Sequence, residues 1–292
     1  MTHIATLIGP DALKALRHAR ASFSHAGEPV ALGPDAADIS FTPDGGADQR
    51  AATDALRLTF GAPYDLVVQP AANRRKRLFL ADMDSTMIGQ ECIDELADFV
   101  GLKAHVAAIT ERAMRGEIEF EPALRERVAL LKGLPVSVVD EVIEKHITLT
   151  PGGRTLVATM RANGGYACLV SGGFTLFTSR IAAMIGFDEA RANALLVEDG
   201  KLSGLVQESI FGRQTKREPL VELRNTLGVS PTDTIVTGDG ANDLDMIMEA
   251  GLGVAYHAKP KVAAAAPARI EYNDLSALLY VQGYRNDEFV QG

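Results

Sequence analysis

The sequence of 292 residues lacks tryptophan, contains only two cysteines and has no long apolar run. Cys92 and Cys168 each stand alone in an apolar stretch, so we expect neither a disulfide framework nor a cysteine metal site. No segment approaches the roughly 20 apolar residues that span a bilayer. The start of the chain lacks the basic and apolar regions of a signal peptide. Together these absences favour a cytoplasmic protein without a membrane partner.

Positive charge is also scarce, because 29 lysines and arginines oppose 38 aspartates and glutamates and leave a net charge of -9. Nucleic-acid backbones are bound by an excess of lysine and arginine, so we expect no nucleic-acid partner. The basic cluster at residues 73–77 favours a solvated linker in so acidic a chain. A phosphate substrate would therefore need a metal ion or a local cation.

The chain divides by its texture into units that together can bury a sizeable core. Residues 1–73 predict a small N-terminal α+β domain, with strands near 4–8, 39–41 and 66–69 and helices over 11–23 and 48–60. Residues 74–86 and 150–292 predict an α/β core, with strands at 78–81, 166–170, 234–237 and 253–256 alternating with helices. Such alternation is typical of a Rossmann-like, doubly wound parallel sheet.

A helical insert is predicted directly after the first strand of this core. Residues 87–149 contain four helical stretches, near 90–100, 103–115, 120–131 and 136–146, separated by glycine and proline. Further along, Asp199 and Gly200 stand between two strand-like segments, and both residue types tolerate the positive φ of a tight turn. We therefore also expect a β-hairpin over 194–206.

Each of three apolar strands of the core ends in a polar turn. These turns are Asp82-Met83-Asp84-Ser85-Thr86, Ser171-Gly172-Gly173 and Gly238-Asp239-Gly240-Ala241-Asn242-Asp243. Ligands of open α/β sheets bind beyond the carboxyl ends of the strands, so the turns can converge on one site. The helix N-termini that follow suit a phosphate. The four aspartates Asp82, Asp84, Asp239 and Asp243 cannot crowd together without a cation, and hard oxygen ligands point to Mg²⁺.

The spacing of Asp82 and Asp84 suggests the reaction. One carboxylate can attack phosphorus and form an aspartyl-phosphate, which divides a difficult displacement into two easier ones. The second carboxyl group can protonate the leaving alkoxide and then take a proton from the attacking water. Lys216, between the second and third turns in the sequence, can neutralise phosphoryl charge.

With these motifs in this order, the chain resembles the haloacid-dehalogenase (HAD) superfamily. The resemblance covers residues 78 to about 285, and the acid at Asp84 favours its phosphatases over its transport ATPases. It is closest to the phosphoserine phosphatase family, through the motifs above and the segments Glu91-Cys92-Ile93-Asp94-Glu95 and Leu124-Arg125-Glu126-Arg127-Val128. The resemblance implies a HAD core that carries a helical cap. It also implies that the protein hydrolyses phosphoserine, which is the last step of serine biosynthesis.

The resemblance also implies residue roles. It makes Asp82 the nucleophile and Asp84 the acid and base, and it places Mg²⁺ on the Asp82 carboxylate, the Asp84 carbonyl, Asp239 and, through water, Asp243. The phosphoryl group would contact Ser171, Gly172, Lys216 and Asn242. Glu91 would face the substrate ammonium group and Arg127 its carboxylate, while Met114 and Phe120 would shield the site.

Only Arg127 has support from the residues alone. On a helix over 120–131 it falls on the apolar stripe, between Leu124 and Leu131. Arginine is rarely buried without a partner, and its planar fork suits a carboxylate. It could equally reach solvent or pair with a local glutamate. Glu91 considered by itself could simply be an acid at a helix N-terminus.

Other functions stay open on the sequence. A phosphotransferase would pass the phosphoryl group to an alcohol such as homoserine, and a related phosphatase would act on another small phosphomonoester. An amino-acid sensor with weak catalysis is a third reading, since the N-terminal unit has the β-α-β texture of a degenerate ACT-type domain. No motif there supports a ligand site, and the choice between monomer and homodimer stays open.

Overall fold

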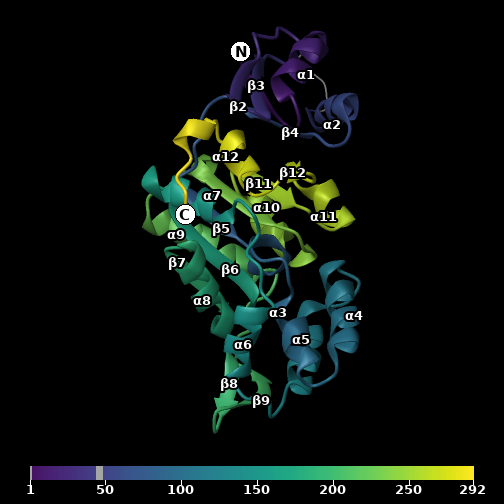
Figure 1. Ribbon diagram of the computed structural model, residues 1–292, viewed down its shortest axis with the longest axis vertical. Helices are drawn as coiled ribbons and strands as arrows, with labels where there is room; N and C mark the ends of the chain where they lie inside the picture. Colours follow the sequence, from purple (N-terminus) through teal and green to yellow (C-terminus); the bar gives the residue numbers. More distant parts are fainter. Residues whose placement is uncertain (1, 44–48) are drawn as a thin grey trace.

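The computed structural model describes residues 2–43 and 49–292, and its centre is a parallel sheet of six strands (Figure 1). These strands are β5 (Leu78–Ala81), β6 (Tyr166–Phe174), β7 (Glu189–Asn193), β10 (Thr234–Gly238), β11 (Leu252–Tyr256) and β12 (Ala268–Ile270). Their order is β12-β11-β10-β5-β6-β7, and every neighbouring pair is parallel. The order reverses direction at β5, so the crevice beyond its carboxyl end lies between β10 and β6.

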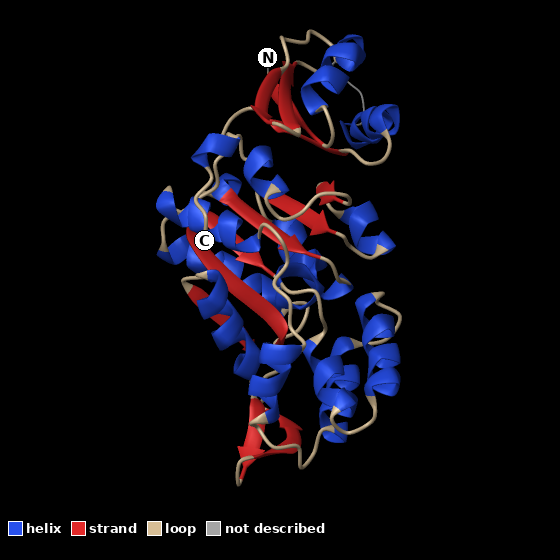
Figure 2. Ribbon diagram, in the orientation of Figure 1, coloured by secondary structure: helices blue, strands red, loops and turns tan. Residues whose placement is uncertain are grey.

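Helices cover both faces of this sheet (Figure 2). Phe79 and Ala81 of β5 pack with α7 (Gly153–Ala162), α8 (Thr175–Ile185) and α12 (Ala277–Val281). Leu78 and Leu80 point to the opposite face, toward α9 (Glu218–Thr226), α10 (Leu244–Glu249) and α11 (Pro260–Ala265). A strand buried on both faces reads as a continuous apolar run, which is why 78–81 signalled a central strand.

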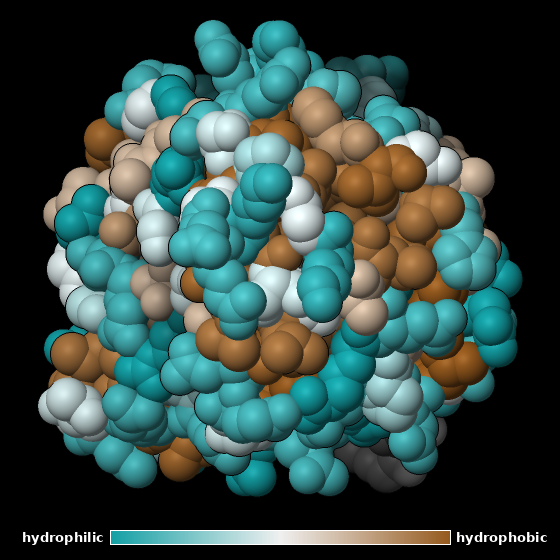
Figure 3. Space-filling view, turned by 90° about the horizontal axis from the view of Figure 1, so that it is seen from below, coloured by the Kyte–Doolittle hydropathy of each residue, from teal (hydrophilic) through white to brown (hydrophobic). Residues whose placement is uncertain are grey.

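The insert after β5 contains α3 (Cys92–Asp98), α4 (Lys103–Met114), α5 (Phe120–Leu130) and α6 (Val138–Lys145). A bridge between Ile88 and Leu149 brings its two ends together. The predicted hairpin forms as β8 (Leu195–Glu198) and β9 (Lys201–Val206), with positive φ at Asp199 and Gly200. It projects at the end of the molecule that Figure 3 shows from below, where apolar patches lie among polar side chains.

The N-terminal residues form a separate antiparallel sheet of order β2-β3-β1-β4. Its strands are β1 (His3–Ile8), β2 (Val30–Gly33), β3 (Ala36–Phe41) and β4 (Asp65–Pro70), accompanied by α1 (Ala12–Ala19) and α2 (Gln49–Phe60). The expected strands and helices are therefore present, apart from residue 48, which lies outside the described residues. The sequence analysis missed β2 here, and β7 and β12 in the parallel sheet.

Buried polar contacts join this sheet to the core. Asp65 accepts hydrogen bonds from the backbone N–H groups of residues 271–273, at 2.7 to 3.2 Å. The Gln69 side chain donates to the Val281 carbonyl at 2.6 Å. Arg74 forms an ion pair with Asp38 at 2.7 Å and also donates to the Val281 carbonyl. The two parts therefore meet through specific contacts and not only through the connecting chain.

The expectation of a solvated basic linker was wrong for two of its residues. The Arg74 guanidinium lies in this joint, and Lys76 is only 7% exposed because its ammonium group donates to the carbonyls of Asn73 and Thr232. Charge counting could not reveal that two segments distant in the sequence supply oxygen acceptors on both sides of the linker. No described helix is long and apolar enough to cross a membrane.

Candidate active site

The turn after β5 places Asp82 at the centre of the site. Its Oδ1 accepts hydrogen bonds from the Met83 backbone N–H and from the Lys216 ammonium group, both at 2.7 Å. Three residues after Asp82, Ser85 adopts a positive φ of 54°, which turns the chain sharply after Asp84. Burial and the charge of Asp243 raise the pKa of Asp82 well above its ordinary range, while Lys216 opposes this rise.

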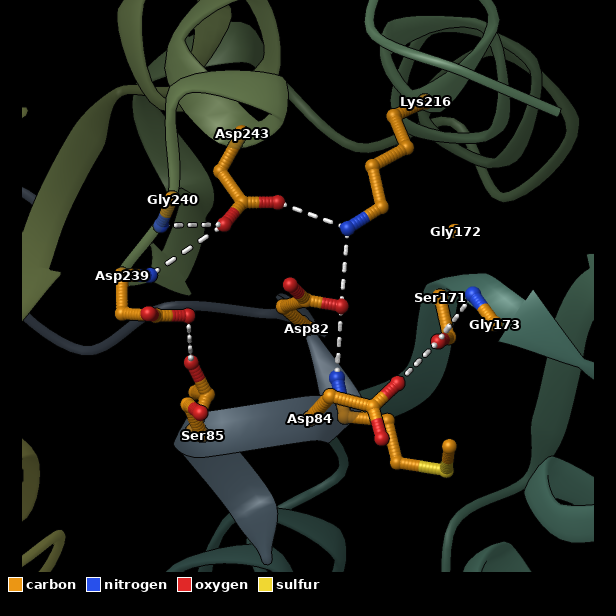
Figure 4. A network of polar contacts seen from close by, with 12 residues as sticks. Asp82, Asp84, Ser85, Ser171, Gly172, Gly173, Lys216, Asp239, Gly240 and Asp243 are labelled. Carbon is orange, nitrogen blue, oxygen red and sulfur yellow. Dashed lines mark hydrogen bonds and ion pairs between the residues drawn. The ribbon is translucent and has the colours of Figure 1, made fainter. Parts of the chain in front are cut away.

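Lys216 links the first and third turns (Figure 4). Its Nζ lies 2.7 Å from Oδ1 of Asp82 and 2.7 Å from Oδ1 of Asp243, and the side chain is fully buried. Burial opposes its positive charge, but the charges of Asp243 and Asp82 outweigh this and raise the pKa of Lys216. The other oxygen of Asp243 accepts from the backbone N–H groups of Asp239 and Gly240, so this carboxylate is held at both oxygens.

Asp84 points to the second turn and not toward Asp239 and Asp243. Its Oδ1 accepts from the Cys92 backbone N–H at 2.9 Å, and its Oδ2 accepts from the Ser171 hydroxyl at 3.2 Å. A Cβ atom on Gly173 would stand 2.8 Å from Oδ2, so this close approach requires glycine. Burial raises the pKa of Asp84, which favours a carboxyl group able to carry a proton.

A group of buried carboxylates fits a hard divalent cation. One oxygen of each of Asp82, Asp239 and Asp243 lies within 4.8 Å of the others. Burial and the charge of Asp243 raise the pKa of Asp239 to about 7, so the three carboxylates repel one another strongly. Lys216 supplies one positive charge in contact with this group, which leaves excess negative charge for a metal ion bound by oxygen ligands. The Asp84 carboxylate does not join the group.

The insert closes this region into a small cavity of about 40 Å³. Asp82 and Asp84 line it from the core, and Glu91, Arg127 and Phe120 line it from the insert. Glu91 is the residue directly before α3, so it is an acid at a helix N-terminus, as its position in the sequence suggested. Its side chain makes no cap hydrogen bond and instead accepts one from the Ser85 hydroxyl at 2.6 Å, on the side of the cavity. Burial and the charge of Asp84 raise the pKa of Glu91 well above its ordinary range.

Arg127 is buried, as its position on the apolar stripe predicted, with 4% of its surface exposed. Its Nε donates to the Ala123 carbonyl at 3.0 Å and its Nη1 donates to the Thr110 hydroxyl at 2.9 Å. These donors are therefore not bonded to solvent or to Glu121 and Glu126 of the same helix. Burial lowers the pKa of Arg127, and the charge of Glu91 opposes this change.

Phe120 separates the inner cavity from a larger outer hollow of about 670 Å³. Its ring seats on two core glycines, because a Cβ on Gly172 would stand 2.9 Å from the ring and one on Gly212 would stand 3.2 Å away. In the same way, a Cβ on Gly240 would stand 2.4 Å from the Met114 methyl group. Bulky side chains of the insert therefore pack against glycines of the core, which have no side chain.

The structure brings together the side chains that the sequence predicted from three distant turns. We had expected Ser171 and Gly172 in a turn after the strand. They lie instead in the last part of β6. Asn242 lines the cavity, and its buried Oδ1 has no hydrogen-bond partner within the described part of the chain. Sequence reasoning missed Cys92 and Thr110 as partners of the site, since neither residue type signalled a polar role there.

Comparison with known proteins places this geometry in a family. The model of the haloacid dehalogenase-like hydrolases matches residues 79–248, which is more than half of the chain. The chain belongs to this family. Its matched segment begins within β5 and ends in α10, so it contains the three strand ends, the insert and Lys216.

Individual relatives extend the match. A phosphoserine phosphatase of Polaromonas sp. (strain JS666) is 49% identical over 208 residues, which cover 70% of this chain and 88% of that protein. A solved HAD family hydrolase of Salmonella enterica serovar Typhi has a TM-score of 0.86 at 29% identity and covers 96% of this chain and 98% of its own. A substrate-bound phosphoserine phosphatase structure has a TM-score of 0.68 at 39% identity, covering 70% of this chain and 98% of its own.

Proposed function

We propose that the chain is a magnesium-dependent phosphoserine phosphatase, which hydrolyses O-phospho-L-serine to L-serine and phosphate as the last step of serine biosynthesis. A relative of that name at 49% identity supports the proposal, as does the similarity to a substrate-bound phosphoserine phosphatase. The division of the chain is part of it: residues 1–73 form an N-terminal domain, 74–86 and 150–292 the catalytic core, and 87–149 its cap.

The observation that carries the proposal is that two kinds of group line the same cavity. Asp82 and Asp84 supply carboxyl groups for phosphoryl transfer, while Glu91 and Arg127 supply opposite charges from the insert. An amino acid carries an ammonium and a carboxylate group, which are complementary to a glutamate and an arginine. A phosphatase for uncharged alcohols would have no use for this buried pair, whose desolvation is costly.

In the first step, an oxygen of the Asp82 carboxylate attacks phosphorus and the bond from phosphorus to the serine oxygen breaks. Asp84 gives its proton to that oxygen, so that serine leaves as a neutral alcohol. The raised pKa of Asp84 suits this role, because the group must hold a proton before it can donate one. Lys216, in contact with Asp82, faces the negative charge that spreads over the phosphoryl oxygens.

In the second step, water attacks the phosphorus of the aspartyl-phosphate and gives its proton to Asp84, and the bond between phosphorus and Asp82 breaks. Inorganic phosphate leaves, and both carboxyl groups return to their initial state. Ser171 and Asn242 orient the phosphoryl group, while Phe120 and Met114 keep bulk water out during the first step. When bound, Mg²⁺ would be held by the Asp82 carboxylate, the Asp84 backbone carbonyl, Asp239 and, through water, Asp243, and it would neutralise the charge of the phosphoryl oxygens.

A phosphate-release assay on three matched esters tests the proposal. Phosphoethanolamine is phosphoserine without its carboxylate, and 3-phosphoglycerate has a hydroxyl group in place of the ammonium. We expect phosphoserine to be hydrolysed with a kcat/KM at least about a hundredfold above either, because each missing partner leaves a buried charge unpaired. Equal rates on all three esters would contradict the assignment of substrate, although not that of phosphatase.

The Asp82→Asn variant tests the mechanism separately. It keeps the shape of the side chain but removes the nucleophile, so we expect no phosphate release above background with Mg²⁺ present. Retained turnover would overturn the aspartyl-phosphate route. Product analysis with added homoserine then distinguishes hydrolysis from transfer, since a phosphotransferase would form phosphohomoserine.

A further inference from the structure

Thr110 connects Arg127 to a carboxylate that lies outside the cavity. The Thr110 hydroxyl, on α4, accepts a hydrogen bond from Nη1 of Arg127 at 2.9 Å and donates one to Oδ1 of Asp94 at 2.7 Å. Asp94 lies in the first turn of α3, and Arg127 lies on α5. The hydroxyl is also 3.1 Å from the Val106 carbonyl, which is the weaker acceptor for its single proton. We call the hydrogen-bonded chain Asp94–Thr110–Arg127 the relay, and it connects three helices of the insert.

We propose that Thr110 and Asp94 are positioning residues, which hold the Arg127 guanidinium in the orientation that receives the carboxylate of the substrate. This inference rests on the proposed function, and it adds to it the residues that determine specificity through Arg127. Arg127 and Thr110 line the cavity, whereas Asp94 does not. Asp94 makes no hydrogen bond to the guanidinium within the described chain, and it contacts Arg127 through the Thr110 hydroxyl.

The relay holds the arginine without occupying it. Both contacts of the guanidinium within the described chain are with neutral oxygens, those of Thr110 and Ala123. They use two of the five N–H donors of an arginine, and the others stay available for a bidentate carboxylate. A direct ion pair between Asp94 and Arg127 would instead compete with the substrate. With Thr110 between them, the negative charge of Asp94 polarises the hydroxyl and strengthens its bond to Arg127.

Fixing the side chain in advance has a physical benefit. A free arginine loses about 2 kcal/mol of rotamer entropy when it is immobilised. Because helices α4 and α5 already hold the guanidinium, most of this entropy is lost when the protein folds. Little more is lost when the substrate binds. Asp94 lies one helical turn after Glu91, at the start of α3. The relay thus sets the position of the arginine relative to the glutamate that would face the ammonium group.

The test compares Thr110→Val, Asp94→Ala and the double variant with wild type, on phosphoserine and on phosphoethanolamine. Valine keeps the shape of threonine and removes the hydroxyl. For phosphoserine we expect each single variant to raise KM by about tenfold with kcat within a factor of about three, because a hydrogen bond to a charged group is lost. For phosphoethanolamine, which lacks the carboxylate, we expect both constants within a factor of about two of wild type.

The double variant makes the relay itself testable. If Asp94 acts only through the hydroxyl, then Thr110→Val combined with Asp94→Ala should be no worse than Thr110→Val alone. The Thr110→Ser variant is the matched control, because it keeps the hydroxyl and should restore the wild-type KM for phosphoserine. Thermal unfolding of every variant shows whether the fold is intact, and Asp94→Ala carries the test if Thr110→Val does not fold.

Three results would overturn the inference: an unchanged KM for phosphoserine, equal losses on both esters, or losses that add in the double variant. Failure of the proposed function can be distinguished from failure of this inference, because it is visible in the wild-type enzyme. A wild-type enzyme that does not prefer phosphoserine to phosphoethanolamine refutes the substrate assignment before any variant is compared.

Discussion

The carboxylate group around Asp239 makes the stability of the metal-free protein depend on pH in a way that one substitution can reveal. Burial and the charge of Asp243 raise the pKa of Asp239 from 3.8 to about 7. Asp239→Asn removes the titration but keeps an oxygen that can accept the hydrogen bond from Thr86. The variant therefore removes the free-energy cost of ionising this carboxyl group without a cation, together with the contribution of its charge to the raised pKa of Asp82.

The sign follows from proton binding. Between about pH 4 and about pH 7 the folded protein holds the proton of Asp239 while the unfolded chain has released it, so stability falls as pH rises through this window. The interval spans roughly three pH units at about 1.4 kcal/mol each, which gives up to about 4 kcal/mol. Relative to wild type, Asp239→Asn should gain up to about 4 kcal/mol at about pH 8 and almost nothing at about pH 4.

Urea unfolding of both proteins in a chelator, over a series of pH values, measures this difference. The surface carboxylates titrate equally in the two proteins and cancel. Added Mg²⁺ should stabilise wild type most at high pH and stabilise the variant much less, because the variant lacks one carboxylate ligand. A difference between the two proteins that stays constant from about pH 4 to about pH 8 would refute the reasoning, whatever its size.

Two further predictions concern single buried contacts. Lys216→Met removes the cation in contact with Asp82 and Asp243, and we expect phosphate release to fall by at least about a hundredfold, as measured with saturating Mg²⁺; loss of less than about tenfold would exclude a direct role. Asp65→Ala leaves three backbone N–H groups after β12 without their acceptor, and we expect the free energy of unfolding to fall by about 3 kcal/mol in urea while kcat on phosphoserine stays within a factor of about two. A large loss of kcat with unchanged stability would contradict that separation.

The parallel sheet and the three converging turns could be predicted because their signals are local. A buried parallel strand needs an apolar run such as 78–81, and the polar residues that follow it in the sequence also follow it in space. Arg127 stood out for the same kind of reason, since a charge on an apolar helical stripe is a local conflict. The strands β2 and β7 were missed because their residues are only partly apolar: Ala190 and Ala192 of β7 alternate with polar or charged residues at the edge of the sheet.

Contacts between distant segments were beyond reach. Nothing near Lys76 indicates that Thr232 will offer it a carbonyl group, and nothing near Thr110 indicates that it will lie between Asp94 and Arg127. Both arrangements depend on how helices and loops pack after each has formed. The sequence pattern therefore located the groups that do chemistry, but not the groups that hold them in place.

The size of the inner cavity has a consequence for the rate of the enzyme. The inner cavity of about 40 Å³ lies behind Phe120, whose ring rests on Gly172, so this side chain narrows the way to Asp82. We expect the insert to move away from the core as each substrate enters and as each serine leaves. Such a motion displaces solvent, so turnover on a fast substrate should slow as the viscosity of the medium is raised, while a poor substrate limited by its chemical step should be indifferent to it.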